Sequence, residues 1–348
     1  MQKYKKKVPL WLPYTESIEI KKTQVYFAYK GGDCIIDISE ILFIMLYGAT
    51  CELSEAFLQL CARNGVPICI HRRTMANAIW ITPSVRTSTK DDILSKQIFF
   101  RGNERKKVHI AKKLLQAKFK SMEWLVPYPF AFDYRKLTIQ EMVNIEAQHA
   151  KNYWKKYYEE LGIFEFSRRG RPHTVKAVLD AVSKLTSGII LRYILYHRLS
   201  PYHGYIHVPT DYPALVYDLM EPYRGYIDKI VFDTIREAQK EGVEEKQFLG
   251  RCIVAVERYF DNIVYTNTTR QLVTFQELLH GAVLSLRSYL QGEPRQFVVP
   301  VPGKPNGGRP LKIGYKLYGR SAGPTNFWAE AEKASQKHER VMETNSKN

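Results

Sequence analysis

The stretch GYIHVPTDYPALVYDLMEPYR, residues 204–224, places His207 ahead of a short predicted helix that carries Asp218 and Glu221. Because the two acids are three residues apart, an α-helix puts them on one face, about 60° apart around its axis. Apolar residues surround them, and no lysine or arginine lies between Pro213 and Glu221. A carboxylate taken into apolar surroundings is destabilising by several kcal/mol unless it is paired or binds a metal. We therefore expect a cationic ligand between His207 and the two acids.

A third acid lies on the apolar side of a different predicted helix. Thr138 and Glu141 form a Ser/Thr-x-x-Glu capping box, which opens a helix that runs to about Leu161. At about 100° per residue, Glu146 falls in the middle of the apolar stripe of that helix. The simplest explanation is an ion pair with a cation from another helix or with His149. Two carboxylates and one imidazole would instead make an open site suited to Mg²⁺ or Mn²⁺.

The whole chain is strongly basic. Its 348 residues include 52 Lys and Arg against 35 Asp and Glu, a net charge of +17. Such an excess points to a polyanion, most often a nucleic acid, with a membrane surface second. No apolar run is long enough to span a bilayer, and the opening MQKYKKKVPLWLP lacks the features of a signal peptide. Five cysteines without CxxC or zinc-ribbon spacing indicate reduced core residues in a cytoplasmic protein.

Hydrophobic periodicity predicts an α+β protein in three parts. Residues 1–88 are predicted to form a small β-rich, sandwich-like domain with one embedded helix and a fully buried strand at residues 41–47. Residues 89–292 are predicted to be all-α. The helix that begins at Pro213 is predicted to run to Glu221, with Pro222 kinking or restarting it. Residues 293–348 are predicted to form a basic arm rich in proline and glycine.

Several cations are placed to contact DNA phosphates. They lie in a basic loop, on the turn after the acids and in the C-terminal arm: Arg168, Arg169, Arg171, Arg224, Arg309, Lys312 and Lys316. The arm also interleaves its cations with tyrosines, a mixture suited to backbone phosphates and base stacking. The alternative for the arm is a solvated tail.

Three motifs, in order, resemble those of the CRISPR-associated integrase family, the metal-dependent subunit that inserts spacers into the repeat array. They are NIEAQHAKNYW around Glu146, GYIHVP with His207, and YDLMEPYR with Asp218 and Glu221. RNGVPICIHRR is similar to the end of the family's β domain, and KKVHIAKKLLQAKF to its first basic helix. One departure is Lys176, where relatives usually have Asn.

The resemblance implies a metal-dependent phosphoryl transfer. Glu146, His207 and Glu221 would bind Mg²⁺ or Mn²⁺ and Asp218 would support them, while a spacer 3′-hydroxyl attacks a phosphodiester of the repeat. A proton-shuttle role remains the alternative for His207. No ATP is required, and no GxxxxGK[ST] pattern is present. The resemblance also implies a homodimer joined through the β domain and a small ferredoxin-like partner.

Two other functions fit parts of the sequence. A DNA nuclease or endonuclease with the same metal site would cut DNA and join nothing. A non-catalytic basic DNA-binding protein would bind in a salt-sensitive way without any divalent metal. That second function leaves Glu146 on an apolar stripe without an explanation.

Overall fold

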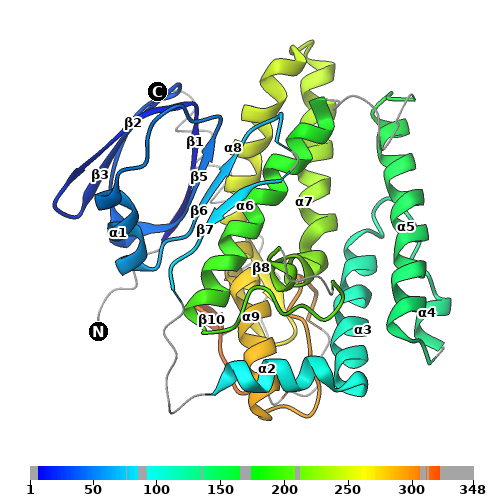
Figure 1. Ribbon diagram of the computed structural model, residues 1–348. Coiled ribbons are helices and arrows are strands. Elements are labelled where there is room, and N and C mark those ends of the chain that lie inside the picture. Colours follow the sequence, from blue (N-terminus) through cyan, green and yellow to red (C-terminus); the bar gives the residue numbers. More distant parts are fainter. Residues whose placement is uncertain are drawn as a thin grey trace. The chain divides into compact units, whose positions relative to one another are not determined.

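A computed structural model describes residues 7–75, 77–84, 92–134, 136–164, 174–207, 212–305, 311 and 313–321. The chain divides into two compact units, Met1–Val256 and Glu257–Asn348. In the first unit β-sheets come first and helices follow, so the predicted α+β class is confirmed (Figure 1). Within the described ranges, no helix combines the length and apolar character needed to cross a membrane.

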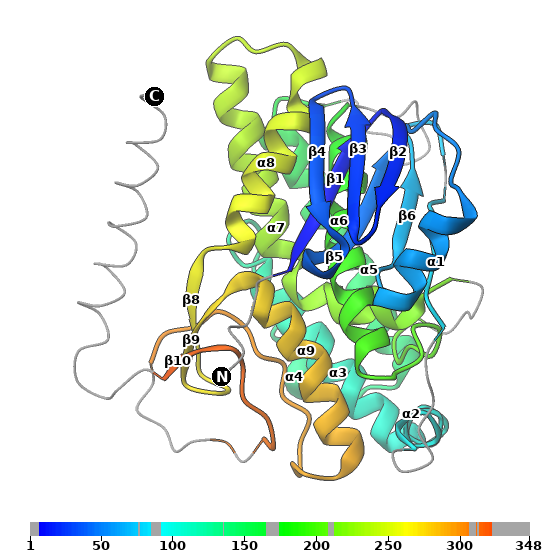
Figure 2. The ribbon, with the colours of Figure 1, turned by 90° about the vertical axis from the view of Figure 1, so that its left-hand side faces the viewer.

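Two sheets form the N-terminal part of the chain (Figure 2). The first has the strand order β1-β5-β6-β7, and its strands are Val8–Pro13, Ile41–Tyr47, Ile68–His71 and Ile79–Ile81. The second has the order β2-β3-β4, with strands Thr15–Lys21, Gln24–Tyr29 and Gly32–Asp37. β5 pairs in parallel with β1 and β6, whereas β7 and the whole second sheet are antiparallel.

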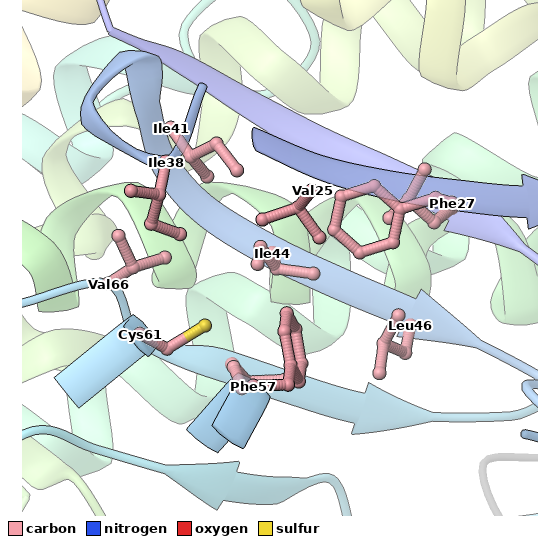
Figure 3. Packing of buried hydrophobic residues seen from close by; sticks show 11 residues of the cluster. Val25, Phe27, Ile38, Ile41, Ile44, Leu46, Phe57, Cys61 and Val66 are labelled. Carbon is pink, nitrogen blue, oxygen red and sulfur yellow. The ribbon is translucent and has the colours of Figure 1, made fainter. Parts of the chain in front are cut away.

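The buried strand β5 is the centre of the N-terminal core. Every residue of β5 is buried, as the continuous apolar run predicts. Ile44 and Leu46 pack with Val25 and Phe27 of β3 and with Phe57 of α1, which spans Glu55–Asn64 (Figure 3). Burying each of these large side chains stabilises the fold by about 1.5–3 kcal/mol. The other side of β5 is covered by α6 (Figure 1).

Helices follow the N-terminal sheets in the first unit. They are α2 (Ile93–Gly102), α3 (Glu104–Ser121), α4 (Ala131–Tyr134), α5 (Ile139–Glu160), α6 (Thr174–Tyr196), α7 (Ala214–Lys240) and α8 (Phe248–Phe260), with short 3₁₀ turns at Ile38–Glu40 and Glu245–Gln247. The last of them, α8, ends just beyond the limit of that unit at Val256. α6 packs on α7, α3 packs on α7, and α5 packs on α3 (Figure 1). The predicted capping box of Thr138 and Glu141 opens α5.

The predicted end of the helix at Glu221, with a restart at Pro222, is wrong, whereas the alternative of a kink at Pro222 stays a prediction. α7 is one helix of 27 residues that contains Pro222 in its interior. A proline inside a helix is destabilising by about 3 kcal/mol, because it lacks an N–H and its ring crowds the preceding turn. Leu219 and Tyr223 are fully buried on either side of the proline, and Ile227 is nearly so. Burial on both sides outweighs the local penalty, so the helix continues.

α3 and α7 cross in close contact at Gly225. The Gly225 N–H donates to Ser121 Oγ at 3.1 Å, and the Trp124 indole N–H donates to the Gly225 carbonyl at 3.0 Å. A Cβ at residue 225 would overlap the backbone carbonyl of Ser121. This contact places Lys118, one turn before Ser121, opposite Glu221, one turn before Gly225.

The second unit contains strands that the sequence analysis does not predict. Its helix α9 spans Phe275–Gln291, and its antiparallel sheet has the order β10-β9-β8, from Gly319–Ser321, Gln271–Thr274 and Ile263–Thr266. The β8–β9 hairpin lies within residues 89–292, so the expectation of helices alone there is wrong. Both strands are only four residues long, so the longer helical patterns on either side obscure them, although Val264 and Val273 are typical strand residues.

The described part of the predicted arm is partly packed, although Leu311, Lys316 and the strand β10 are exposed. Phe297, Ile313 and Leu317 are buried. The Gln271 amide donates to the Leu317 carbonyl at 2.8 Å and accepts from the Leu317 N–H at 2.9 Å, so one side chain pairs with both backbone groups. The limits proposed for the three parts, at residues 88 and 292, stay a prediction.

Gly225→Ala should lower the free energy of unfolding by about 1–3 kcal/mol, because the added methyl group would force α3 and α7 apart. Chemical denaturation of the variant and the wild type measures the change. Gly250→Ala in α8 is the control, since a Cβ there has no atom within 4 Å. That variant should match the wild type or gain up to about 1 kcal/mol from helix propensity. Equal effects of the two substitutions would contradict the close crossing.

Candidate active site

Asp218 is fully buried on α7, and hydrogen bonds reach both of its carboxylate oxygens. Oδ2 accepts from the backbone N–H groups of Tyr205, at 2.5 Å, and Ile206, at 2.9 Å. Oδ1 accepts from the His207 N–H at 3.1 Å and lies 2.6 Å from His207 Nδ1. One carboxylate therefore ties residues 205–207 to α7 and fixes the imidazole of His207.

Gly204 allows this segment to lie so close to α7. A Cβ at residue 204 would be 2.7 Å from the His207 carbonyl oxygen and 2.8 Å from Asp218 Oδ2. Both distances are too short for a carbon atom. A side chain here would push the segment away from Asp218, so the glycine is required for the position of His207.

His207 combines a fixed nitrogen with a partly exposed ring. Its side chain is 38% exposed, and Asp218 holds Nδ1. Burial lowers the pKa of His207, but the hydrogen bond and charge of Asp218, with a contribution from Glu221, raise it above the ordinary value. Histidines that bind metals commonly donate the N–H of their second ring nitrogen to a carboxylate. The arrangement suits a metal ligand or a proton carrier, the two roles left open by the sequence.

The ammonium group of Lys118 joins the two glutamates. Lys118 Nζ donates to Glu146 Oε1 at 2.5 Å and lies 2.5 Å from Glu221 Oε2. The Lys118 side chain is 5% exposed, that of Glu221 6%, and that of Glu146 23%. Glu146 on α5 and Glu221 on α7 therefore converge on one cation from α3. The ion pair considered as the simplest explanation of Glu146 is present.

Arg224 completes the surroundings of Glu221. Its Nη1 lies 3.4 Å from Glu221 Oε1, and its side chain is 29% exposed. Burial raises the pKa of Glu221, but the charges of Arg224 and Lys118 outweigh burial and lower it to about 2. One turn further along α7, burial raises the pKa of Asp228 to about 7, although Arg224 acts against that shift. Arg224, predicted as a phosphate contact, is thus also a partner of Glu221.

The donor set fits a divalent metal, although its side chains are not gathered as ligands in this arrangement. Among the described residues, no three His, Cys, Asp or Glu side chains lie close enough together to hold a metal ion. Two carboxylates from different helices nevertheless converge on one positive charge, and Asp218 orients a neighbouring imidazole. Those are ligand types that Mg²⁺ and Mn²⁺ accept. Metal binding by Glu146, His207 and Glu221 stays a prediction.

Lys118 is the residue that sequence reasoning missed. The helix that carries it is strongly basic, which hides one lysine on its inner side. Ile110, Leu114 and Lys118 are spaced by four residues, and all three are buried. A lysine at a position of the apolar stripe is therefore the signal that could have identified it.

A cavity of about 1070 Å³ extends from the cluster between α5, α6 and α7. Glu146, Arg224 and Asp228 are on its wall. The other charged and aromatic residues that line it are Lys151, Lys155, Lys176, Glu159, Asp180, Trp154, Tyr158 and Phe164. Its volume is in the range of small-molecule and cofactor sites. Its wall therefore carries four cations, four carboxylates and three aromatic rings, so positive and negative charges are balanced there.

Other predicted phosphate contacts are only partly covered by the structure. Arg168, Arg169, Arg171, Arg309 and Lys312 lie outside the described residues. Lys316 is exposed in the second unit, next to buried Leu317. The structure therefore places two of the seven predicted cations, Arg224 and Lys316.

These features define a mixed α+β protein in which buried acids and one imidazole lie beside a cavity lined by charged and aromatic side chains. The chain belongs to the Cas1 family: the family model for CRISPR associated protein Cas1 matches residues 12–129 and 134–253. The family resemblance drawn from the three motifs is thereby confirmed.

Two curated relatives are similar to this chain over less than a third of its length. CRISPR-associated endonuclease Cas1 2 of Pyrobaculum aerophilum is 31% identical over 105 residues, which is 30% of this chain and 35% of the relative. CRISPR-associated endonuclease Cas1 of Korarchaeum cryptofilum is 33% identical over 100 residues, 26% of this chain and 29% of the relative. The chain thus matches about a third of the length of these curated relatives.

Solved structures with the same fold cover most of the chain. A Cas1 protein from Thermotoga maritima has a TM-score of 0.68 at 17% identity, covering 86% of this chain and 100% of its own. A casposase bound to integration product has a TM-score of 0.69 at 16% identity, covering 84% of this chain and 93% of its own. At such identities the similarity establishes the fold.

Asp218→Asn should lower the pKa of His207 and the free energy of unfolding, the latter by about 1–3 kcal/mol. The amide lacks the negative charge that raises the pKa, and its NH₂ group would face N–H donors. Because the folded pKa of wild-type His207 is raised, its contribution to stability is present below the ordinary value and is lost as pH rises through the raised value. NMR titration of the His207 ring and denaturation at several pH values measure both effects.

Asp233→Asn is the matched control on the same helix. Asp233 pairs with Lys229 on the surface at 2.5 Å, and its side chain is 52% exposed. That substitution should change the stability by less than about 1 kcal/mol and leave the titration of His207 unchanged. The assigned role of Asp218 is wrong if His207 titrates alike in both variants.

Proposed function

We propose that the protein is a metal-dependent DNA integrase of CRISPR adaptation, which joins spacer 3′-hydroxyl ends to the repeat by phosphodiester transesterification. The observation that supports this most directly is the convergence of Glu146 and Glu221, from α5 and α7, on one positive charge beside an imidazole held by Asp218. Membership of the Cas1 family and the net charge of +17 agree with a DNA substrate.

Each member of the cluster has a role in this proposal. A divalent metal, Mg²⁺ or Mn²⁺, held by Glu146, His207 and Glu221, would supply Lewis-acid stabilisation of charge on the phosphate oxygens. Asp218 keeps the His207 ring in one orientation. Arg224 keeps Glu221 ionised, because its charge lowers the pKa of that carboxyl group. Asp218 and Arg224 thereby fix the His207 ring and the charge of Glu221 before the substrate arrives.

The transfer conserves phosphodiester bonds. The oxygen of the spacer 3′-hydroxyl forms a bond to phosphorus, the bond from phosphorus to a repeat 3′-oxygen breaks, and one proton moves from the attacking to the leaving oxygen. His207, with its raised pKa and partly exposed ring, is placed to carry that proton if it is not a metal ligand. The cavity beside Glu146 would take the strand end, with cations for phosphates and rings for bases.

The assembly and location of the protein are part of the same proposal. We expect a homodimer joined through the β-rich N-terminal part, and a small ferredoxin-like partner, as in the integrase family. We also expect the protein to act in the cytoplasm. All five cysteines are free, and burial raises the pKa of Cys61, Cys69 and Cys252 to about 12, as suits inert thiols in a reducing compartment.

Hydrolysis of DNA is the second candidate, because the same cluster could act on water in place of a 3′-hydroxyl. The curated relatives named above carry the word endonuclease in their names. Labelled duplexes with 3′-hydroxyl ends, incubated with a plasmid that bears the repeat and with Mn²⁺, distinguish the two. Labelled plasmid indicates integration, whereas nicked or linear plasmid without label indicates a nuclease. A non-catalytic DNA-binding protein would give neither product.

Glu146→Ala and His207→Ala should each reduce strand transfer at least ~100-fold, because each removes a group that acts on the reacting phosphate or on the metal. Binding of the same duplex, measured by fluorescence anisotropy, should be largely unchanged. Glu160→Ala is the control, since Glu160 is exposed at the end of the same helix α5. Full strand transfer by either of the first two variants would refute the proposed site.

A further inference from the structure

We infer that Lys118 is a built-in counter-ion that occupies the metal position between Glu146 and Glu221, so that a divalent metal binds only by displacing its ammonium group. This inference rests on the proposed function, because it assumes that the two glutamates are metal ligands. It goes beyond that function in assigning a role to a residue outside the acid and imidazole motifs. The role follows from three observations on distance, burial and attachment.

The distances leave no room for two cations. Lys118 Nζ is 2.5 Å from Glu146 Oε1 and 2.5 Å from Glu221 Oε2. A magnesium ion shared by two carboxylates lies about 2.0–2.1 Å from each oxygen. An ion bound by these two oxygens would therefore stand almost where the nitrogen stands now. The ammonium and the metal compete for the same two oxygens.

Burial makes the ammonium necessary when no metal is bound. The side chains of Lys118 and Glu221 are 5% and 6% exposed and that of Glu146 is 23% exposed, so water reaches Glu146 in part but hardly reaches Glu221. Without a cation, two carboxylates would face each other across a buried gap, which is strongly unfavourable. Arg224 neutralises only the far side of Glu221, through Oε1 at 3.4 Å. Lys118 therefore stabilises the site in its metal-free form.

Because Lys118 is attached to α3 through a flexible side chain, a metal ion can replace its ammonium group without movement of the helix. α3 is fixed against α7 by the contact of Ser121 with Gly225, one turn further along. A lysine carries its charge on a flexible four-carbon stem, so rotation of the side chain alone can release the two oxygens. The released ammonium stays beside the site on α3. A phosphodiester of the substrate would be its next anionic partner.

Manganese binding in the absence of DNA tests the inference. We would measure Mn²⁺ affinity by isothermal titration calorimetry for the wild type, Lys118→Met, Lys118→Arg and the control Lys120→Met. Lys120 lies on the same helix, is 69% exposed and is 3.5 Å from Glu123. Lys118→Met should bind Mn²⁺ at least tenfold more tightly than the wild type, since no ammonium has to leave. Lys118→Arg, whose fork can hold both carboxylates, should bind more weakly than Lys118→Met.

Thermal unfolding supplies a second readout. Metal-free Lys118→Met should melt below the wild type, and Mn²⁺ should raise its melting temperature by more than that of the wild type. Lys120→Met should behave as the wild type in both measurements. If Lys118 only supports the structure, Lys118→Met will melt lower and bind Mn²⁺ with unchanged or weaker affinity. That result overturns the inference.

If Lys118→Met does not fold, chemical labelling of Lys118 in the wild type can still show whether Mn²⁺ displaces its ammonium group. Acylation of lysines by a succinimidyl ester, mapped by mass spectrometry, should modify Lys118 faster with saturating Mn²⁺ than without metal. Equal rates overturn the inference. The proposed function fails separately: a wild type that binds no Mn²⁺ refutes the metal site itself. Mn²⁺ binding by the wild type without tighter binding by Lys118→Met refutes only the role of Lys118.

Discussion

One ammonium group shared by two carboxylates constrains three helices at once. Lys118 belongs to α3, Glu146 to α5 and Glu221 to α7, and both contacts measure 2.5 Å. Ions taken out of water destabilise a fold by several kcal/mol each unless they find partners. The packing of the three helices must therefore bring these groups together. Asp218, one turn earlier on α7, is also a buried carboxylate that needs partners. It finds them in the segment that carries His207 and thereby fixes that segment.

Elements that depend on neighbouring residues could be predicted from the sequence. The capping box of Thr138 and Glu141 opens α5, and the apolar run 41–47 forms the buried strand β5. The helix predicted within the β-rich part is present as α1, which Ser54 caps and Gly65 closes in the left-handed conformation at φ 65°. Each of these outcomes is decided within a few residues, where local propensity and tertiary packing favour the same structure.

Elements that depend on distant residues could not be predicted. The continuation of α7 past Pro222 requires the buried surroundings of Leu219 and Tyr223, which no local pattern reports. In the candidate site, too, local sequence patterns predicted some features and missed others that depend on distant residues. The spacing of its acids and the apolar position of Glu146 indicated where a positive charge was needed. A carboxylate can be neutralised by an ammonium group as well as by a metal ion, so the acids alone did not decide between Lys118 and a metal. The place of Lys118 in the apolar stripe of its own helix was the additional signal.

The proline within α7 also affects how the acidic turn can respond to its surroundings. Pro222 has no N–H, so the carbonyl of Asp218, four residues before it, lacks the hydrogen bond that an ordinary helix would supply. The backbone ladder of α7 is thus interrupted at the level of its two acids, while the helix remains buried on both sides. Bending at such a gap is easier than elsewhere in a helix. The carboxylates can therefore adjust to a different cation through a local change, and the α3–α7 crossing does not need to move.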